Sequence, residues 1–189
     1  MKKFSSNKDE IVDKTQDESR VVYKNKYLTV VEFNNWSFID EWDSVVVLPF
    51  FIDSNEFLLR SEYISPFKYR DSADFHLTCI SGSVEPGESI EACAARELVE
   101  EAGIKLKDNV VFEVFDTLYK AKNTSSQFHF VFLPLYDYQY DDVVATTDGT
   151  KYEEVSKTIK LRVSSINSLS PADTSTRILI EYLKKYLNM

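Results

Sequence analysis

The chain has 189 residues, of which 43% are apolar and 14% aromatic, a composition typical of one globular domain with a sizeable core. With 31 acidic and 22 basic residues, its formal net charge of −9 argues against a DNA- or RNA-binding surface, which needs an excess of Lys and Arg. No apolar run resembles a membrane span or a secretory signal, so we expect a cytoplasmic protein.

The N-terminal part is expected to contain a tail and a hairpin. Residues 1–19 are polar and mixed in charge, which is typical of a flexible tail. Two β-rich runs lie on either side of a polar turn at residues 24–26 and predict a hairpin, which residues 36–39 can extend. We therefore expect a small β-hairpin region over residues 20–42 and the main domain over residues 43–189.

The next segments predict paired strands. Residues 44–52 are almost wholly apolar and predict a central strand, with residues 56–60 pairing back against it. Residues 61–72 are expected to form a loop. Basic residues in or next to this loop could bind a substrate phosphate, and Arg60 and Arg70 are the candidates, with solvated surface charge as the alternative explanation.

Residues 82–104, GSVEPGESIEACAARELVEEAGI, hold six glutamates and one arginine. Within them we predict a helix from about residue 89 to 102, because Ser89 suits the N-cap and Gly103 suits a left-handed C-cap. A strand over residues 75–80 would lead into Gly82 at the start of this stretch.

Three glutamates share one arc of the predicted helix. Glu97, Glu100 and Glu101 are spaced three and four residues apart, which makes them neighbours on the helix surface. Like charges at this spacing destabilise a helix unless a cation lies among them, and Arg96 relieves only part of the repulsion. Converging carboxylates are what a hard divalent cation needs, whereas a solvated acidic face is the alternative explanation.

The C-terminal half predicts more strands and one helix. Strands are expected over residues 110–119, 128–136 and 155–163, with a polar loop at 120–126 and a long acidic loop at 137–151. Ser170 and Pro171 are expected to open a final helix, with the serine as its cap and the proline in its first position.

The stretch from residue 82 to 104 resembles the signature of Nudix hydrolases, G-x5-E-x7-R-E-U-x-E-E-x-G-U, in which U is a bulky apolar residue. Every defined position is filled, by Gly82, Glu88, Arg96, Glu97, Leu98, Glu100, Glu101, Gly103 and Ile104. A match over 23 residues is far more specific than a short glycine motif.

The resemblance implies a fold and a reaction. The fold would be an α/β/α sandwich around a mixed β-sheet, in which the motif forms a loop, a helix and a loop. The reaction would be Mg²⁺-dependent hydrolysis of the pyrophosphate of a nucleoside diphosphate linked to another group, with Mn²⁺ as a possible substitute. Glu97, Glu100, Glu101 and the backbone carbonyl of Gly82 would bind the metal.

The resemblance also implies roles for further residues. Glu88 and Arg96 would orient the metal ligands. The general base would be either Glu101 of the motif or a glutamate of a later loop, for which Glu153 and Glu154 are the candidates. These three base candidates could also be plain surface charges.

The N-terminal region resembles that of ADP-ribose pyrophosphatases, in which it exchanges between subunits and helps to bind adenine. This implies a homodimer through residues 20–40, bases stacked on Phe33, Trp36 and Phe38, and cleavage of ADP-ribose to AMP and ribose 5-phosphate. These aromatic side chains could equally pack a sheet.

Other substrates stay open. About 16 residues beyond the motif, where ADP-ribose pyrophosphatases usually carry proline, this chain has Lys120. The adjacent Tyr119 is similar in position to a tyrosine of enzymes that act on dinucleoside polyphosphates. NAD(H), nucleotide sugars, capped RNA and nucleoside triphosphates are further alternatives. A non-catalytic nucleotide-binding module is another, but such modules typically lose motif glutamates that this chain keeps.

Overall fold

The computed structural model describes residues 19–26, 28–70, 73–146, 155–171 and 173–189. Its contacts divide the chain into two compact units. One unit contains the chain up to Glu41 together with Tyr119–Ser126, and the other contains Trp42–Leu118 and Gln127–Met189. We describe each unit by itself.

The first unit contains a three-stranded antiparallel sheet in the order β1-β2-β3. Its strands are β1 Arg20–Lys24, β2 Thr29–Phe33 and β3 Trp36–Asp40, so the hairpin and its extension are present as predicted. Asn34 and Asn35 form the turn between β2 and β3 with φ angles of 50° and 61°, a left-handed conformation that asparagine tolerates well.

The second unit is built on a seven-stranded mixed sheet. Its main order is β12-β5-β4-β10-β9, with β6 pairing β5 and β7 pairing β4. β10 runs parallel to β4, whereas β5 and β7 run antiparallel to it. The strands are β4 Ser44–Phe51, β5 Glu56–Glu62, β6 His76–Thr78, β7 Ile80–Ser83, β9 Glu113–Tyr119, β10 Gln127–Leu135 and β12 Lys157–Arg162.

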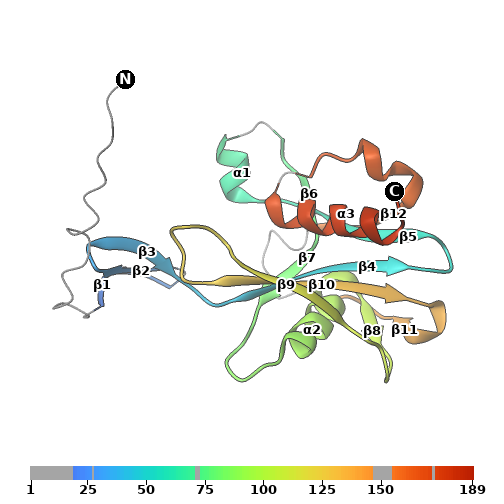
Figure 1. Cartoon of the computed structure of the whole chain (residues 1–189), viewed down its shortest axis with the longest axis horizontal. Helices are drawn as coiled ribbons and strands as arrows, with labels where there is room; N and C mark the ends of the chain where they lie inside the picture. The colour runs from blue at the N-terminus through green and yellow to red at the C-terminus, as the bar shows by residue number, and fades with distance from the viewer. Residues whose placement is uncertain (1–18, 27, 71–72, 147–154, 172) are drawn as a thin grey trace. The chain divides into compact units, whose positions relative to one another are not determined.

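The predicted central strand is confirmed. Every residue of β4 is buried, because both faces of this strand are covered. Figure 1 shows α3 and α2 on opposite sides of the sheet. α3, Thr174–Tyr186, packs Leu179, Ile180 and Leu183 on one face, and α2, Ile90–Ala102, packs Ala94 and Leu98 on the other. The expected α/β/α sandwich is therefore present.

Two segments predicted as loops contain regular structure. Within residues 61–72, β5 continues to Glu62 and a short helix α1 spans Ser65–Arg70, with Pro66 in its first turn, where proline is tolerated. Within residues 137–151, the 3-10 helix η1 Asp137–Gln139 is followed by β11 Tyr140–Asp142. β11 pairs with β8, Ile104–Leu106, which the sequence analysis missed because three residues are too few for a pattern.

The start of the last helix was predicted wrongly. The helix begins at Thr174, and its N-cap is Asp173, whose carboxylate accepts a hydrogen bond from the Thr176 backbone N–H at 2.8 Å. A 3-10 helix η2, Val163–Ser168, precedes this part of the chain. Ser170 is a suitable cap by residue type, but in the structure the aspartate three residues later makes the capping bond.

Both cysteines, Cys79 and Cys93, are buried and free. Burial raises the pKa of the Cys93 thiol to about 12 and raises that of Cys79 as well. None of the helices formed by the described residues combines the length and the apolar character needed to cross a bilayer.

Candidate active site

The motif helix α2 forms as its caps predict. The Ser89 side chain accepts a hydrogen bond from the Ala92 backbone N–H at 3.1 Å, and Gly103 ends the helix with φ of 63°. A side chain at position 103 would also collide with the backbone of Val143. Glycine is therefore needed there for its conformation and for its size.

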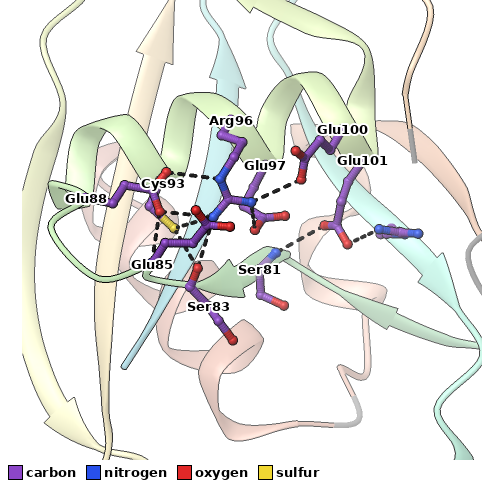
Figure 2. Close-up of polar contacts among 10 residues, drawn as sticks. Ser81, Ser83, Glu85, Glu88, Cys93, Arg96, Glu97, Glu100 and Glu101 are labelled. Carbon is purple, nitrogen blue, oxygen red and sulfur yellow. Dashed lines mark hydrogen bonds and ion pairs between the residues drawn. The ribbon is translucent and has the colours of Figure 1, made fainter. Parts of the chain in front are cut away.

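Arg96 lies at the centre of the motif carboxylates, as Figure 2 shows. Its Nε and Nη2 donate to both Glu88 carboxylate oxygens, at 3.0 and 3.1 Å. Its Nη1 donates to Glu97 Oε1 at 2.6 Å and to Glu100 Oε2 at 3.0 Å, while Nη2 also reaches the Ser83 carbonyl at 3.0 Å. One guanidinium therefore offsets the repulsion among three glutamates.

Glu101 points to a different cation. One of its oxygens forms an ion pair with Arg60 of β5, and the other, Oε2, accepts a hydrogen bond from the Ser81 backbone N–H at 3.2 Å. The side chains of Arg60 and Glu101 are only 3% and 11% exposed. The three carboxylates that share one arc in sequence are thus divided, two on Arg96 and one on Arg60.

Gly82 allows the Glu97 carboxylate to approach β7. A Cβ placed at position 82 would overlap the Glu97 carboxylate group, so any other residue would displace it. Gly82 therefore provides space for the Glu97 carboxylate beside its own backbone, whose carbonyl is the fourth predicted metal ligand.

The donor set fits a divalent cation in its chemistry. Glu88, Glu97, Glu100 and Glu101 carry four negative charges against the two guanidinium groups of Arg96 and Arg60, which leaves two negative charges unbalanced. Oxygen ligands of this kind suit Mg²⁺. Within the ranges that the structure describes, no three acidic, histidine or cysteine side chains already converge as a metal site, since Arg96 Nη1 lies between Glu97 and Glu100.

The pairing of Glu88 and Arg96 shifts both pKa values. The hydrogen bonds that Arg96 donates hold the pKa of the Glu88 carboxyl below its ordinary 4.5. The same bonds raise the pKa of the Arg96 guanidinium. Both groups are therefore charged throughout the physiological range.

This pairing predicts a pH dependence of stability. Because the folded-state pKa of Glu88 is lowered, its contribution is fully present above pH 4.5 and is lost as the pH falls through the folded-state value. We expect the free energy of unfolding of wild type to exceed that of Glu88→Gln by a constant amount above this pH, and the gap to close below it. Urea unfolding between pH 3 and pH 7 measures this. Glu91→Gln, an exposed change on the same helix, is the control, and a gap that persists unchanged at pH 3 would contradict the assignment.

The remaining candidate residues lie elsewhere. Arg70 is exposed at the end of α1, so phosphate binding by Arg60 and Arg70 stays a prediction. Glu153 and Glu154 lie outside the described residues. In the first unit, Trp36 and Tyr119 are 62% and 68% exposed.

The other aromatic candidates also belong to the first unit. Phe33 is exposed and Phe38 is half-buried, and both stand on its three-stranded sheet. Tyr119 lines a cavity of about 480 Å³ together with Ala121, Lys122 and Thr124. Base stacking by these aromatic residues stays a prediction.

Sequence reasoning missed two contributions to the site. One is the Ser81 backbone N–H, which no side-chain pattern can reveal. The other is the ion pair of Arg60, which was considered for substrate phosphate and not for Glu101. A charged residue at the end of the apolar run at residues 57–59 was the available signal, because a buried arginine needs an anionic partner.

Known proteins resemble this chain in sequence and in fold. A family model described as NUDIX domain matches residues 42–175, which include the whole motif. NAD-capped RNA hydrolase NudC of Photobacterium profundum is 32% identical over 104 residues, which cover 55% of this chain and 35% of that protein. This chain therefore spans about a third of the length of that relative.

A crystal structure of an ADP compounds hydrolase has the same fold. It superposes with a TM-score of 0.68 at 18% sequence identity, and the match covers 90% of this chain and 92% of the other. At this identity the likeness concerns the fold alone.

Proposed function

The chain belongs to the Nudix family, since the NUDIX domain model covers most of its length, and from this we propose that it is a metal-dependent pyrophosphohydrolase acting on ADP-ribose. The observation that supports the proposal is the complete motif around α2, in which Glu101 accepts a hydrogen bond from the Ser81 N–H of β7 and the Glu97 carboxylate lies against Gly82 of the same strand. A protein with this fold is named an ADP compounds hydrolase, and an ADP-containing substrate is what we propose for this chain as well.

Hydrolysis of ADP-ribose breaks one phosphoanhydride bond. Water adds to one phosphorus, the bridging oxygen leaves with the other, and the products are AMP and ribose 5-phosphate. Mg²⁺ bound to Glu97, Glu100, Glu101 and the Gly82 carbonyl would neutralise phosphate charge and lower the pKa of a bound water.

The side chains of the motif would organise this site. Glu88 holds Arg96 through two hydrogen bonds, and Arg96 in turn orients Glu97 and Glu100. Such supporting contacts orient metal ligands and tune their basicity. We propose Glu101, whose two oxygens are held by Arg60 and the Ser81 N–H, as the motif candidate for the general base, with Glu153 and Glu154 as the candidates from the later loop.

A second substrate class has its own support. The relative that is 32% identical over 104 residues is named an NAD-capped RNA hydrolase. NAD also contains a pyrophosphate, whose phosphoanhydride bond joins AMP to a second nucleotide, so the same motif chemistry would serve. The net charge of −9 gives little attraction for a long RNA strand, which favours the smaller nucleotide.

A substrate panel tests the proposal. We expect the full chain with Mg²⁺ to convert ADP-ribose to AMP and ribose 5-phosphate with a kcat/KM at least about tenfold above that for NADH, a difference of about 1.4 kcal/mol in transition-state binding. The panel would contain ADP-ribose, NADH, NAD-capped RNA, a dinucleoside polyphosphate, a nucleotide sugar and ATP, with products separated by ion-exchange chromatography. If the enzyme prefers NAD-capped RNA, the proposed substrate ADP-ribose is wrong, but the proposed reaction, hydrolysis of a pyrophosphate, is still correct. Tight nucleotide binding without hydrolysis under Mg²⁺ or Mn²⁺ would point to the binding module.

We also propose a homodimer through residues 20–40. Every residue of β1 is exposed, and Val21, Tyr23 and Trp36 are 59%, 53% and 62% exposed, so the sheet of the first unit presents apolar surface. Multi-angle light scattering at micromolar concentration is expected to give twice the 21.9 kDa chain mass. Tyr23→Lys is expected to weaken this dimer, and a monomer in the wild type would contradict the proposal.

A further inference from the structure

Arg60 occupies an unusual place for an arginine. It lies on β5, paired in register with Thr78 of β6 on one side and Thr158 of β12 on the other. Leu58, two residues earlier on the same face of the strand, belongs to the core beneath α2. The guanidinium of Arg60 is therefore directed to the α2 face of the sheet, where its side chain is 3% exposed.

Among the residues that the structure describes, one anion pairs with this buried cation. Glu101 of α2 forms the ion pair with Arg60. Glu62, the next residue on the same face of β5, accepts a hydrogen bond from the Thr78 hydroxyl at 3.0 Å. A buried guanidinium is tolerated only when it is paired, so the Arg60–Glu101 contact is a requirement of the fold as well as a feature of the site.

The two arginines of the site differ in their freedom. The Arg96 side chain, which lies among the motif carboxylates, is 28% exposed and therefore borders solvent. Arg60 is enclosed by the sheet and α2 and has no comparable route to solvent. Its positive charge therefore lies beside Glu101 in a buried environment.

We propose that Arg60, which lies outside the signature, is the positioning residue for Glu101. It holds one carboxylate oxygen while the Ser81 N–H holds the other, so that Glu101 is presented in one orientation. Its charge also offsets that of Glu101 and so reduces the attraction of the glutamate cluster for a divalent cation. The inference rests on the proposed function for its kinetic part, but not for its cation-binding part.

Two substitutions separate geometry from charge. Arg60→Lys keeps the positive charge but replaces the planar fork with a single ammonium on a flexible stem. Arg60→Gln removes the charge and keeps much of the length. Arg162→Gln on the neighbouring strand β12, where the side chain is exposed, is the matched control for loss of one positive charge.

Mn²⁺ binding to the full chain without nucleotide, followed by electron paramagnetic resonance, tests the charge effect. Arg60→Gln is expected to bind Mn²⁺ about threefold or more tightly than wild type, because a cation beside the carboxylates is gone. Arg60→Lys and Arg162→Gln are expected to stay within about twofold of wild type, since the charge is kept or is distant. Circular dichroism establishes that each variant is folded. If Arg60→Gln does not fold, the hydrolysis kinetics of Arg60→Lys decide whether the proposal stands.

Steady-state hydrolysis tests the geometric effect. Arg60→Lys is expected to lower kcat by about tenfold or more with KM within about threefold of wild type, as for loss of a contact that orients a ligand. A kcat within twofold of wild type in Arg60→Lys would overturn the proposal. A parallel loss of stability and of Mn²⁺ affinity in both Arg60 variants would also overturn it, because such a loss indicates that Arg60 has only a structural role. If wild type binds Mn²⁺ but hydrolyses nothing in the panel, the proposed function fails and the Mn²⁺ affinities alone decide on Arg60. Absence of Mn²⁺ binding in wild type would overturn both.

Discussion

Glu97→Gln is expected to lower kcat for ADP-ribose hydrolysis by at least about a hundredfold, the scale of losing one group that stabilises charge in a transition state. Of the two α2 glutamates that pair with Arg96, Glu97 is the more buried, with 10% of its side chain exposed. Its carboxylate lies against Gly82 of β7. Glutamine has nearly the same shape but no charge, so it would keep the packing and lose the attraction for a divalent cation.

Initial rates across a range of Mg²⁺ concentrations measure this effect. We expect the Mg²⁺ concentration for half-maximal rate to rise in Glu97→Gln, because a ligand has been weakened. Glu91→Gln, on the exposed face of the first turn of the same helix, is the matched control and is expected to keep the wild-type rate. Activity of Glu97→Gln within about threefold of wild type, about 0.7 kcal/mol in the barrier, would show that this glutamate does not bind the catalytic metal.

Glu101→Gln is expected to reduce the free energy of unfolding by about 3–5 kcal/mol, the usual result of leaving one partner of a buried ion pair uncompensated. Its partner, Arg60, has 3% of its side chain exposed and cannot turn to water without disturbing the sheet. For a chain of this length, each kcal/mol corresponds to about 2–4 °C in Tm, so the loss is visible by calorimetry.

Glu100→Gln provides the matched comparison for the second prediction. Its side chain is 35% exposed and pairs with Arg96, which is 28% exposed, so we expect its removal to cost less than about 1 kcal/mol. The double variant Arg60→Leu with Glu101→Leu is expected to recover much of the stability that Glu101→Gln loses, since an apolar pair needs no charge compensation. Equal destabilisation by Glu100→Gln and Glu101→Gln would show that burial of Arg60 does not govern the effect. Hydrolysis by these variants need not follow the same order, because both residues belong to the proposed metal site.

Several features of this protein could be predicted from the sequence because they depend on near neighbours in the chain. The caps at Ser89 and Gly103 define α2 within one residue, and the continuous apolar run at residues 44–52 identifies the buried central strand β4. The spacing of Glu97, Glu100 and Glu101 also places them on one arc of α2. A helix repeats every 3.6 residues and a strand every two, so such features follow from local geometry.

Other features appear only when distant segments are brought together. The short strands β8 and β11 are stabilised by pairing with each other, and the cap of α3 is Asp173 although Ser170 suits that position by its residue type. A short element has too few residues to show a pattern. Two residues that both suit an N-cap cannot be told apart by residue type, because the surrounding structure decides where the helix begins.

The division of the motif glutamates illustrates the same limit at the site. By sequence, Glu97, Glu100 and Glu101 form one acidic group with Arg96 as its nearest cation. In the structure, the ion pair between Glu101 and Arg60 joins α2 to a sheet strand far away in the chain, whereas Glu97 and Glu100 stay with Arg96. The sequence determined which carboxylates lie on the helix, because rotation about a helix axis is a local property. Only the packing of α2 on the sheet decided which cation each carboxylate meets, because that depends on how the layers are stacked.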